Sequence, residues 1–169
     1  GLTAEDLGAI QALDVVDGAE GAYFQDVLLQ AGQTEIVARV HSITTSVNQL
    51  ALQSGRMPES ETEIVVEDSF LQNTDHQLGD RLSLSPSDSD TMPNTLTIVG
   101  TVTSPLYFEC NVVKSNHGKT SIGTGTVNYY FYGLPELFRQ DYYTEIYITC
   151  PGAKDCKTSD AEYTDLVQA

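Results

Sequence analysis

The chain has 169 residues, enough for one domain that buries roughly 70% of the surface its unfolded form would expose. Its 24 acidic residues outnumber 8 basic ones, and the formal net charge is −16. Phosphate recognition needs clustered Lys and Arg, so this composition excludes nucleic acid as a partner. The charge also disfavours docking on an anionic lipid surface, and it suits a solvated domain or a cationic partner.

The sequence shows no targeting or membrane-spanning segment. Residues 1–13 lack the basic start and the apolar run of a signal peptide. No stretch approaches the roughly 20 apolar residues that a membrane helix needs. If the protein is part of a membrane assembly, we expect its anchors to lie outside this sequence.

The first predicted element is a helix with a complete set of start signals. Thr3 occupies the N-cap position and Asp6 the third helical position, which together form a capping box. Leu2 and Leu7 occupy the positions of a hydrophobic staple. Apolar residues then recur at near-helical spacing, and the helix should end near Leu13.

The next segment changes to strand patterns. Residues 22–29 and 35–40 flank a glycine-bearing stretch at 31–34, which predicts a β-hairpin with a loop of roughly four residues. Residues 44–61 are polar and contain glycine and proline, so we assign them mostly to loop. Residues 63–67 form a short apolar run bounded by charge, which predicts an inner strand.

The middle of the chain continues in short elements. A helical turn is expected at residues 69–73, followed by a half-exposed strand at 78–84, where apolar and polar residues alternate. Residues 85–94 are polar and carry two prolines, which predicts a hairpin loop. Residues 95–103 form the strongest predicted strand, because they are rich in β-branched side chains.

The C-terminal part combines a long loop with aromatic strands. Residues 109–126 are rich in glycine and serine and predict a loop. Strands are expected at 127–132 and 144–149, with a helical turn at 135–138 between them. A second capping box at Ser159 predicts a final helix that is still running at the last residue.

This pattern predicts an α+β fold, in which a mixed, mostly antiparallel sheet is flanked by N-terminal and C-terminal helices. We expect one domain spanning residues 1–169. The pattern also allows two lobes, one formed by residues 1–43 with 95–169 and the other by residues 44–94.

No motif in the sequence supports catalysis, a cofactor or a metal ion. Residues 117–120 resemble the end of a phosphate-binding loop, but Val113 stands where that loop needs glycine. Asp88 and Asp90 fit a solvated polar loop better than a calcium site, since the next ligand position holds Met92. The three histidines are isolated and are predicted to lie on the surface or in loops: His41, His76 and His117.

Charged residues between positions 56 and 63 form a first candidate surface for a partner. Glu59, Glu61 and Glu63 alternate, so they would share one face of an extended chain. With Arg56 nearby, Glu59 and Glu61 could meet a cationic partner. An exposed strand edge guarded by charge explains the same pattern.

Aromatic residues form a second candidate surface. Alternation along a strand places Tyr130 and Tyr132 on the face opposite Tyr129 and Phe131. One set should be core, and the other could line a groove for a partner or substrate, because tyrosine combines apolar area with a hydroxyl group. Core packing of both sets is the favoured alternative.

The cysteines allow a disulfide. Cys150 and Cys156 flank the turn dipeptide Pro151-Gly152, which could bring their sulfurs together. Such a bond would indicate an oxidising compartment. The alternative is three unrelated thiols, and Cys110 is left over in either case.

Several segments resemble, in the same order, a known family pattern. The pieces are Gly1-Leu2-Thr3 with Asp6-Leu7, Leu52-Gln53-Ser54-Gly55-Arg56-Met57-Pro58 with Glu63-Ile64-Val65-Val66, Leu78-Gly79-Asp80-Arg81-Leu82, and Leu96 to Phe108. Together they resemble the extracytoplasmic core domain of MacB/FtsX-type ABC-transporter permeases, which is inserted between the first and second membrane helices. Residues 109–126 and the aromatic block are longer than in the shortest members and resemble the large permeases of Gram-positive bacteria.

The resemblance implies a role without covalent chemistry and without a cofactor. The domain would lie on the extracytoplasmic side of the cell membrane, attached to the membrane helices of the same permease. A cytoplasmic ATP-binding subunit would act on it indirectly, through the membrane. The domain would pass that motion to an external substrate or partner protein, through the 44–62 segment or the surface near Tyr130 and Tyr132.

Two other classes of function remain open. A free-standing binding lipoprotein would need a lipidated cysteine upstream and no second membrane span. A cell-wall hydrolase would need a nucleophile or a metal constellation, which these residues do not supply.

Overall fold

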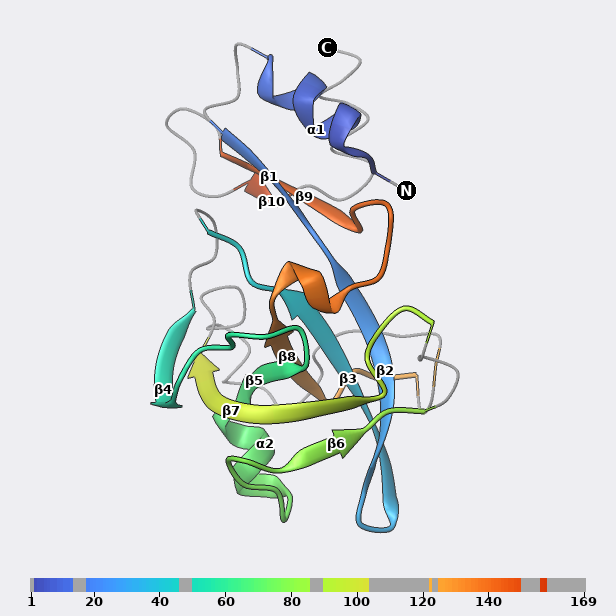
Figure 1. Ribbon diagram of the computed structural model, residues 1–169, viewed down its shortest axis with the longest axis vertical. Coiled ribbons are helices and arrows are strands. Elements are labelled where there is room, and N and C mark those ends of the chain that lie inside the picture. The colour runs from blue at the N-terminus through green and yellow to red at the C-terminus, as the bar shows by residue number, and fades with distance from the viewer. Residues whose placement is uncertain are drawn as a thin grey trace. The chain divides into compact units, whose positions relative to one another are not determined.

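The computed structural model describes residues 2–13, 18–45, 50–85, 90–103, 122, 125–149 and 156–157. The chain divides into two compact units, whose helices and strands are labelled in Figure 1. The first comprises Gly1–Tyr23, Thr44–Val47 and Gln140–Ala169, and the second comprises Phe24–Ile43 and Asn48–Arg139. The two lobes expected from the sequence have different bounds and stay a prediction.

The first unit packs one helix against a three-stranded sheet. Helix α1 spans Ala4–Gln11, and strands β1 (Gly18–Ala22), β9 (Glu145–Thr149) and β10 (Cys156–Lys157) form an antiparallel sheet in the order β1-β9-β10. Ile10 and Ile146 are buried in its core, and the two leucines of the predicted staple pack against them. The unit therefore joins segments from opposite ends of the sequence.

The predicted capping box of α1 is confirmed. The Thr3 hydroxyl oxygen accepts a hydrogen bond from the Asp6 amide at 3.2 Å, and the Asp6 carboxylate accepts one from the Thr3 amide at 2.7 Å. These two bonds satisfy amide groups that have no partner inside the helix. The helix ends at Gln11, two residues before the predicted end.

The second unit is built on a seven-stranded sheet in the order β2-β3-β8-β5-β7-β4, with β6 paired to β7. Two pairings are parallel, β3 with β8 and β5 with β7, and the others are antiparallel. The predicted α+β class with a mixed, mostly antiparallel sheet is therefore confirmed. Its elements are β2 (Phe24–Ala31), β3 (Thr34–Ser42), β4 (Ala51–Gly55), β5 (Glu63–Glu67), α2 (Asp68–Asn73), β6 (Arg81–Ser83), β7 (Thr95–Thr103), β8 (Tyr129–Gly133) and the 3₁₀ helix η3 (Pro135–Leu137).

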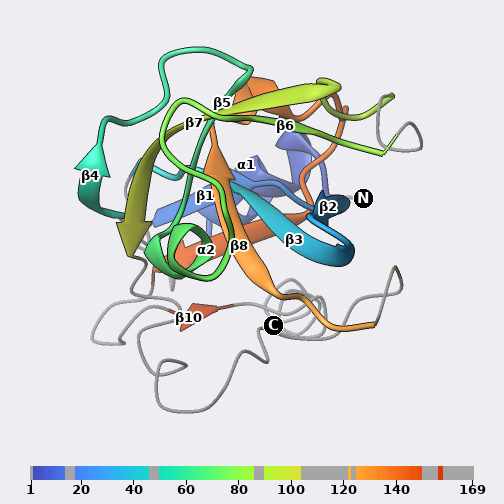
Figure 2. The same ribbon diagram turned by 90° about the horizontal axis from the view of Figure 1, so that it is seen from below.

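The sheet of the second unit curls, as the view from below in Figure 2 shows. Strand β5 lies between β8 and β7, and its three central residues, Ile64, Val65 and Val66, are fully buried. A strand covered on both faces is apolar throughout rather than alternating, which explains the short apolar run in the sequence. Phe70 of α2 is also buried, and its ring meets the Phe131 ring of β8 edge-on at 4.9 Å.

Two local predictions for this unit are wrong. Ala31 pairs with Thr34, so the β2–β3 turn has two residues rather than four, and Gly32 supplies the positive φ of 66° that such a tight turn favours. Residues 51–55 form strand β4 instead of loop. This strand has no β-branched residue, and its conformation comes from long-range pairing with β7.

The predicted C-terminal helix from Ser159 lies outside the described residues. None of the helices in the described part of the chain is long and apolar enough to cross a membrane.

We predict that Thr3→Ala weakens α1 locally. Losing an N-cap side chain costs about 1 kcal/mol, which corresponds to an about fivefold larger equilibrium constant for opening of the helix. Hydrogen exchange of the α1 amides measures this, and Thr3→Ser, which keeps the hydroxyl group, should exchange like the unmodified chain. Equal exchange in Thr3→Ala would show that the packing of Ile10, rather than the cap, holds the helix.

Candidate functional site

The candidate site is built on residues 56–62, which we call the crossover loop. This loop connects β4 to β5, and β7 lies between those two strands in the sheet. Both ends of the loop are fastened to β7. The Arg56 amide donates to the Val99 carbonyl at 3.0 Å, and the Thr97 amide donates to the Thr62 carbonyl at 2.8 Å.

Two glycines let the chain pass this close to β7. Gly55 has a φ of 71°, and a side-chain carbon there would lie 2.2 Å from the Val99 carbonyl oxygen. A side-chain carbon at Gly100 would lie 2.4 Å from the Arg56 carbonyl oxygen. Both distances are impossible for a real side chain, so the loop requires glycine at both positions. This role was not predicted from the sequence, although a glycine inside the strongest predicted strand is typical of a close backbone approach.

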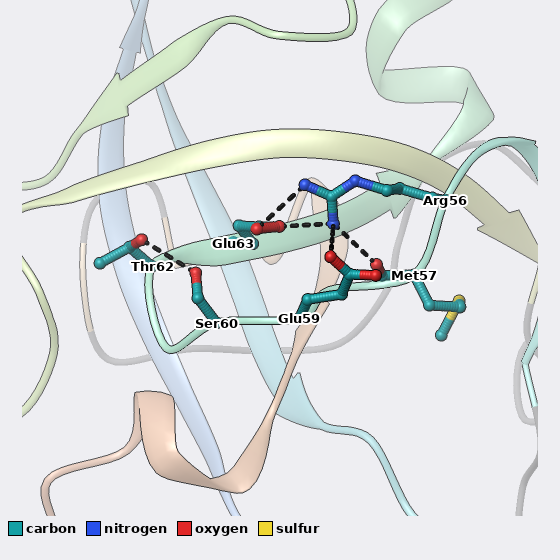
Figure 3. A network of polar contacts seen from close by, with 6 residues as sticks. All are labelled: Arg56, Met57, Glu59, Ser60, Thr62 and Glu63. Atoms are coloured by element: carbon teal, nitrogen blue, oxygen red, sulfur yellow. Dashed lines mark hydrogen bonds and ion pairs between the residues drawn. The ribbon is translucent and has the colours of Figure 1, made fainter.

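Arg56 holds the crossover loop in place, as Figure 3 shows. Its guanidinium group meets the Glu63 carboxylate with two contacts, Nη1 to Oε2 at 2.6 Å and Nη2 to Oε1 at 3.0 Å. The Nη2 contact is a hydrogen bond and the Nη1 contact is an ion pair, so Arg56 meets both carboxylate oxygens of Glu63. Nη1 also donates to the Met57 carbonyl at 3.1 Å and lies 3.6 Å from a carboxylate oxygen of Glu59. One side chain therefore ties the start, the middle and the end of the loop together.

The electrostatics of the loop follow from this contact. The hydrogen bond from Arg56 lowers the pKa of Glu63, and the positive charge of Arg56 adds to the effect. The same bond raises the pKa of Arg56. The Glu63 side chain is 15% exposed, whereas those of Arg56 and Glu59 are 50% and 78% exposed. Glu63 is thus the anchored carboxylate, and Glu59 is available to solvent.

Glu59, Glu61 and Glu63 would share one face in an extended chain, but residues 60–62 are not extended. The chain turns before β5 begins, and Glu59 from the middle of the loop and Glu63 from the start of β5 both contact Arg56. Glu61 is exposed and makes no hydrogen bond or ion pair within the described part of the chain. The candidate surface therefore consists of Arg56, Glu59 and Glu61, with Glu63 beneath it.

The prediction of a partner surface at Tyr130 and Tyr132 is wrong, because both side chains are buried, with 2% and 3% of their surface exposed. They pack in the core cluster with Val37 and Val65. Strand β8 lies inside the sheet between β3 and β5, and both of its faces are covered. The alternative interpretation, in which both faces are core, holds for Tyr130, Phe131 and Tyr132.

The histidine prediction is wrong for His41, and His117 lies outside the described residues. His41 on β3 is 5% exposed, and its ring lies 5.5 Å and 5.7 Å from the rings of Tyr130 and Tyr132. A single histidine in a strand gives no sequence signal for this aromatic environment, because its neighbours come from a strand far along the chain.

An open pocket of about 570 Å³ lies elsewhere in the second unit. The β2–β3 turn, the end of α2 and Asp80 line it, and its lining includes Asp75, His76 and Tyr129. His76 Nδ1 lies 3.4 Å from an Asp80 carboxylate oxygen, and the His76 ring stacks on Phe70 at 5.3 Å. The residues that line the pocket include no serine or cysteine that could act as a nucleophile beside a base. Nowhere in the described ranges are three His, Cys, Asp or Glu residues grouped to hold a metal ion.

The predicted disulfide is not tested. Cys110 and Cys150 lie outside the described residues, and only the backbone of Cys156 is described, in β10.

The fold resembles that of the extracellular domain of an ABC-type transporter. The chain superposes on the extracellular domain of the noncanonic ABC-type transporter YknZ from Gram-positive bacteria with a TM-score of 0.57 and 10% sequence identity. The match covers 98% of this chain and 78% of that one. The periplasmic region of MacB from Actinobacillus actinomycetemcomitans matches with a TM-score of 0.45 and 12% identity, over 98% and 71% of the two chains.

No protein-family profile matches the sequence, and no curated protein sequence matches it. At 10% identity the likeness to YknZ establishes the fold alone. This fold agrees with the fold that the resemblance of the ordered sequence segments implies.

We predict that Gly100→Ala destabilises the second unit by about 1–3 kcal/mol, the usual cost of forcing an extra carbon into a packed site. The added carbon would push Arg56 and its loop away from β7. Urea unfolding followed by tyrosine fluorescence measures this, since the chain has 9 tyrosines and no tryptophan. The matched control is Gly18→Ala, at a strand glycine with open space around it. Equal losses in both variants would contradict the close approach.

We predict that Glu63→Gln removes an acid-sensitive part of the stability. Because the folded pKa of Glu63 lies below its ordinary value of 4.5, its contribution is fully present above pH 4.5. The contribution is lost as the pH falls through the lower folded pKa. Urea unfolding across this pH range should therefore show the gap between the unmodified chain and Glu63→Gln closing on acidification. In an Arg56→Gln background the same change should leave a smaller pH-dependent gap, because only the hydrogen bonds from the Glu59 backbone and the Ser60 side chain would still lower the pKa of Glu63. An undiminished gap would contradict the role of Arg56.

Proposed function

We propose that this chain is the extracytoplasmic domain of an ABC-transporter permease. The observation that carries the proposal is the likeness of its fold to the extracellular domain of YknZ over 98% of this chain. The ordered sequence segments that resemble MacB/FtsX-type permeases support it independently, because they were identified from the residues alone.

In this role the domain performs no chemistry of its own. ATP binding and hydrolysis by a cytoplasmic subunit move the membrane helices of the permease, and the domain passes that motion to an external substrate or partner protein. The sheet of the second unit suits this task. Its inner strands are buried on both faces, and packed interiors move as units rather than deforming continuously.

The surface proposed for the external partner is the crossover loop, through Arg56, Glu59 and Glu61. These side chains are exposed, and the bond from Arg56 to Glu63 fixes the loop that carries them. A loop that is already ordered loses less conformational entropy when a partner binds. The net charge of −16 favours a partner with a basic surface.

Membrane fractionation of the native full-length protein, probed with an antibody to this domain, tests the proposal. We expect the antigen to stay in the membrane after an alkaline wash and to be cut when protease is applied to intact cells. A cytoplasmic protein that survives the protease is the control for intact cells. Release by the wash or into the medium would contradict the permease role and favour a free-standing binding protein.

A further inference from the structure

Strand β4 forms an exposed end of the seven-stranded sheet. Among the described strands it pairs with β7 alone, and all five of its residues are exposed. Leu52 is 44% exposed, which makes it one of the large apolar residues left at the surface. An edge of this kind presents a row of backbone N–H and C=O groups that another chain can pair with.

The two end strands of the sheet differ in their protection. Strand β2, at the opposite end, is mostly half-buried, and its Asp26 forms an ion pair of 2.7 Å with Arg39. Proteins commonly guard exposed edges with charged residues or proline. Strand β4 reads Ala-Leu-Gln-Ser-Gly and contains neither.

Strand β4 is firmly held on its inner side. The Ser54 and Thr101 hydroxyl groups share a hydrogen bond of 2.6 Å, and the side-chain amide of Gln53 donates to the Thr103 hydroxyl group at 3.3 Å. The end of the strand is fixed by Gly55 and by Arg56 of the crossover loop. A partner would therefore meet an ordered strand, and only its own segment would lose freedom on binding.

The charges near strand β4 indicate which kind of chain could pair with it. Glu59 and Glu61 are exposed in the loop that directly follows β4. With Arg56 and Glu63, they leave this short region with two more negative than positive charges. A second copy of the chain would bring another −16 and be repelled, whereas a basic segment would be attracted.

We propose that β4 binds an extended, Lys- and Arg-bearing segment of an external protein partner, which adds to the sheet as a further strand. Backbone pairing supplies the affinity in this binding mode, and side chains at alternate positions supply the selectivity. The irregular register between Leu52 and Ser54 limits the length that can pair, so binding should be moderate in strength. The inference rests on the proposed function, because that function supplies the external partner.

The test uses the 169-residue chain labelled for amide hydrogen exchange. The probe is a short capped peptide of alternating Val and Lys. Two matched peptides serve as controls, one with Glu in place of Lys and one N-methylated at alternate residues to block backbone pairing. We expect the first peptide alone to bind and to slow the exchange of amides in residues 51–55.

The charge contribution is tested with Glu59→Gln/Glu61→Gln. Exposed ion pairs contribute only weakly, so this double change should weaken peptide binding about three- to tenfold. The control is Glu136→Gln, at an exposed acidic residue of η3, which should leave binding unchanged. Both variants keep the Arg56–Glu63 pair.

Protection of residues 51–55 with selective binding of the basic peptide supports the proposal. Equal binding of the N-methylated peptide, or binding without protection of β4, would overturn strand addition. Protection of β4 without peptide, together with dimerisation in ultracentrifugation, would overturn it in favour of a second copy. These outcomes are independent of membrane fractionation, so failure of the permease role and failure of strand addition can be told apart.

Discussion

The crossing of β7 by residues 56–62 is the constraint on which the second unit depends. Strands β4 and β5 lie on opposite sides of β7, so the chain between them has to pass close over that strand. The passage is possible because Gly55 and Gly100 leave room for the backbone. Arg56 then fixes the loop to Glu63, the first residue of the buried strand β5. The contact between Arg56 and Glu63 thus links the exposed edge strand β4 to the buried strand β5.

This arrangement gives a structural meaning to the sequence segment from Leu52 to Pro58. Gly55 makes the turn, Arg56 binds Glu63, Met57 packs against the core cluster, and Pro58 is buried. The residues from Leu52 to Pro58, which suggested a binding surface, therefore stabilise the fold in the first place. Its functional value is indirect, because the same contacts present Glu59 and Glu61 on an ordered loop.

Part of the candidate site was predictable and part was not. The sequence indicated an acidic surface after residue 55, and Arg56, Glu59 and Glu61 are exposed there. The same reasoning placed Tyr130 and Tyr132 on a possible surface, and they are core. Alternation tells which side chains share a face, but it does not tell whether a second layer covers that face. For β8 the answer depends on segments far away in the sequence, which no local pattern can supply.

The sequence by itself determined the local elements whose signals lie within a few residues. The capping box of Thr3 and Asp6, the β-branched strand β7 and the apolar strand β5 all formed as predicted. Only the tertiary structure decided that residues 51–55 form a strand and that Arg56 forms an ion pair with Glu63. Both depend on contacts with β7. The β7 residues that pair with β4, and Gly100 among them, lie about 45 residues after β4 in the chain. Local propensity is weak there, so long-range pairing determines the structure.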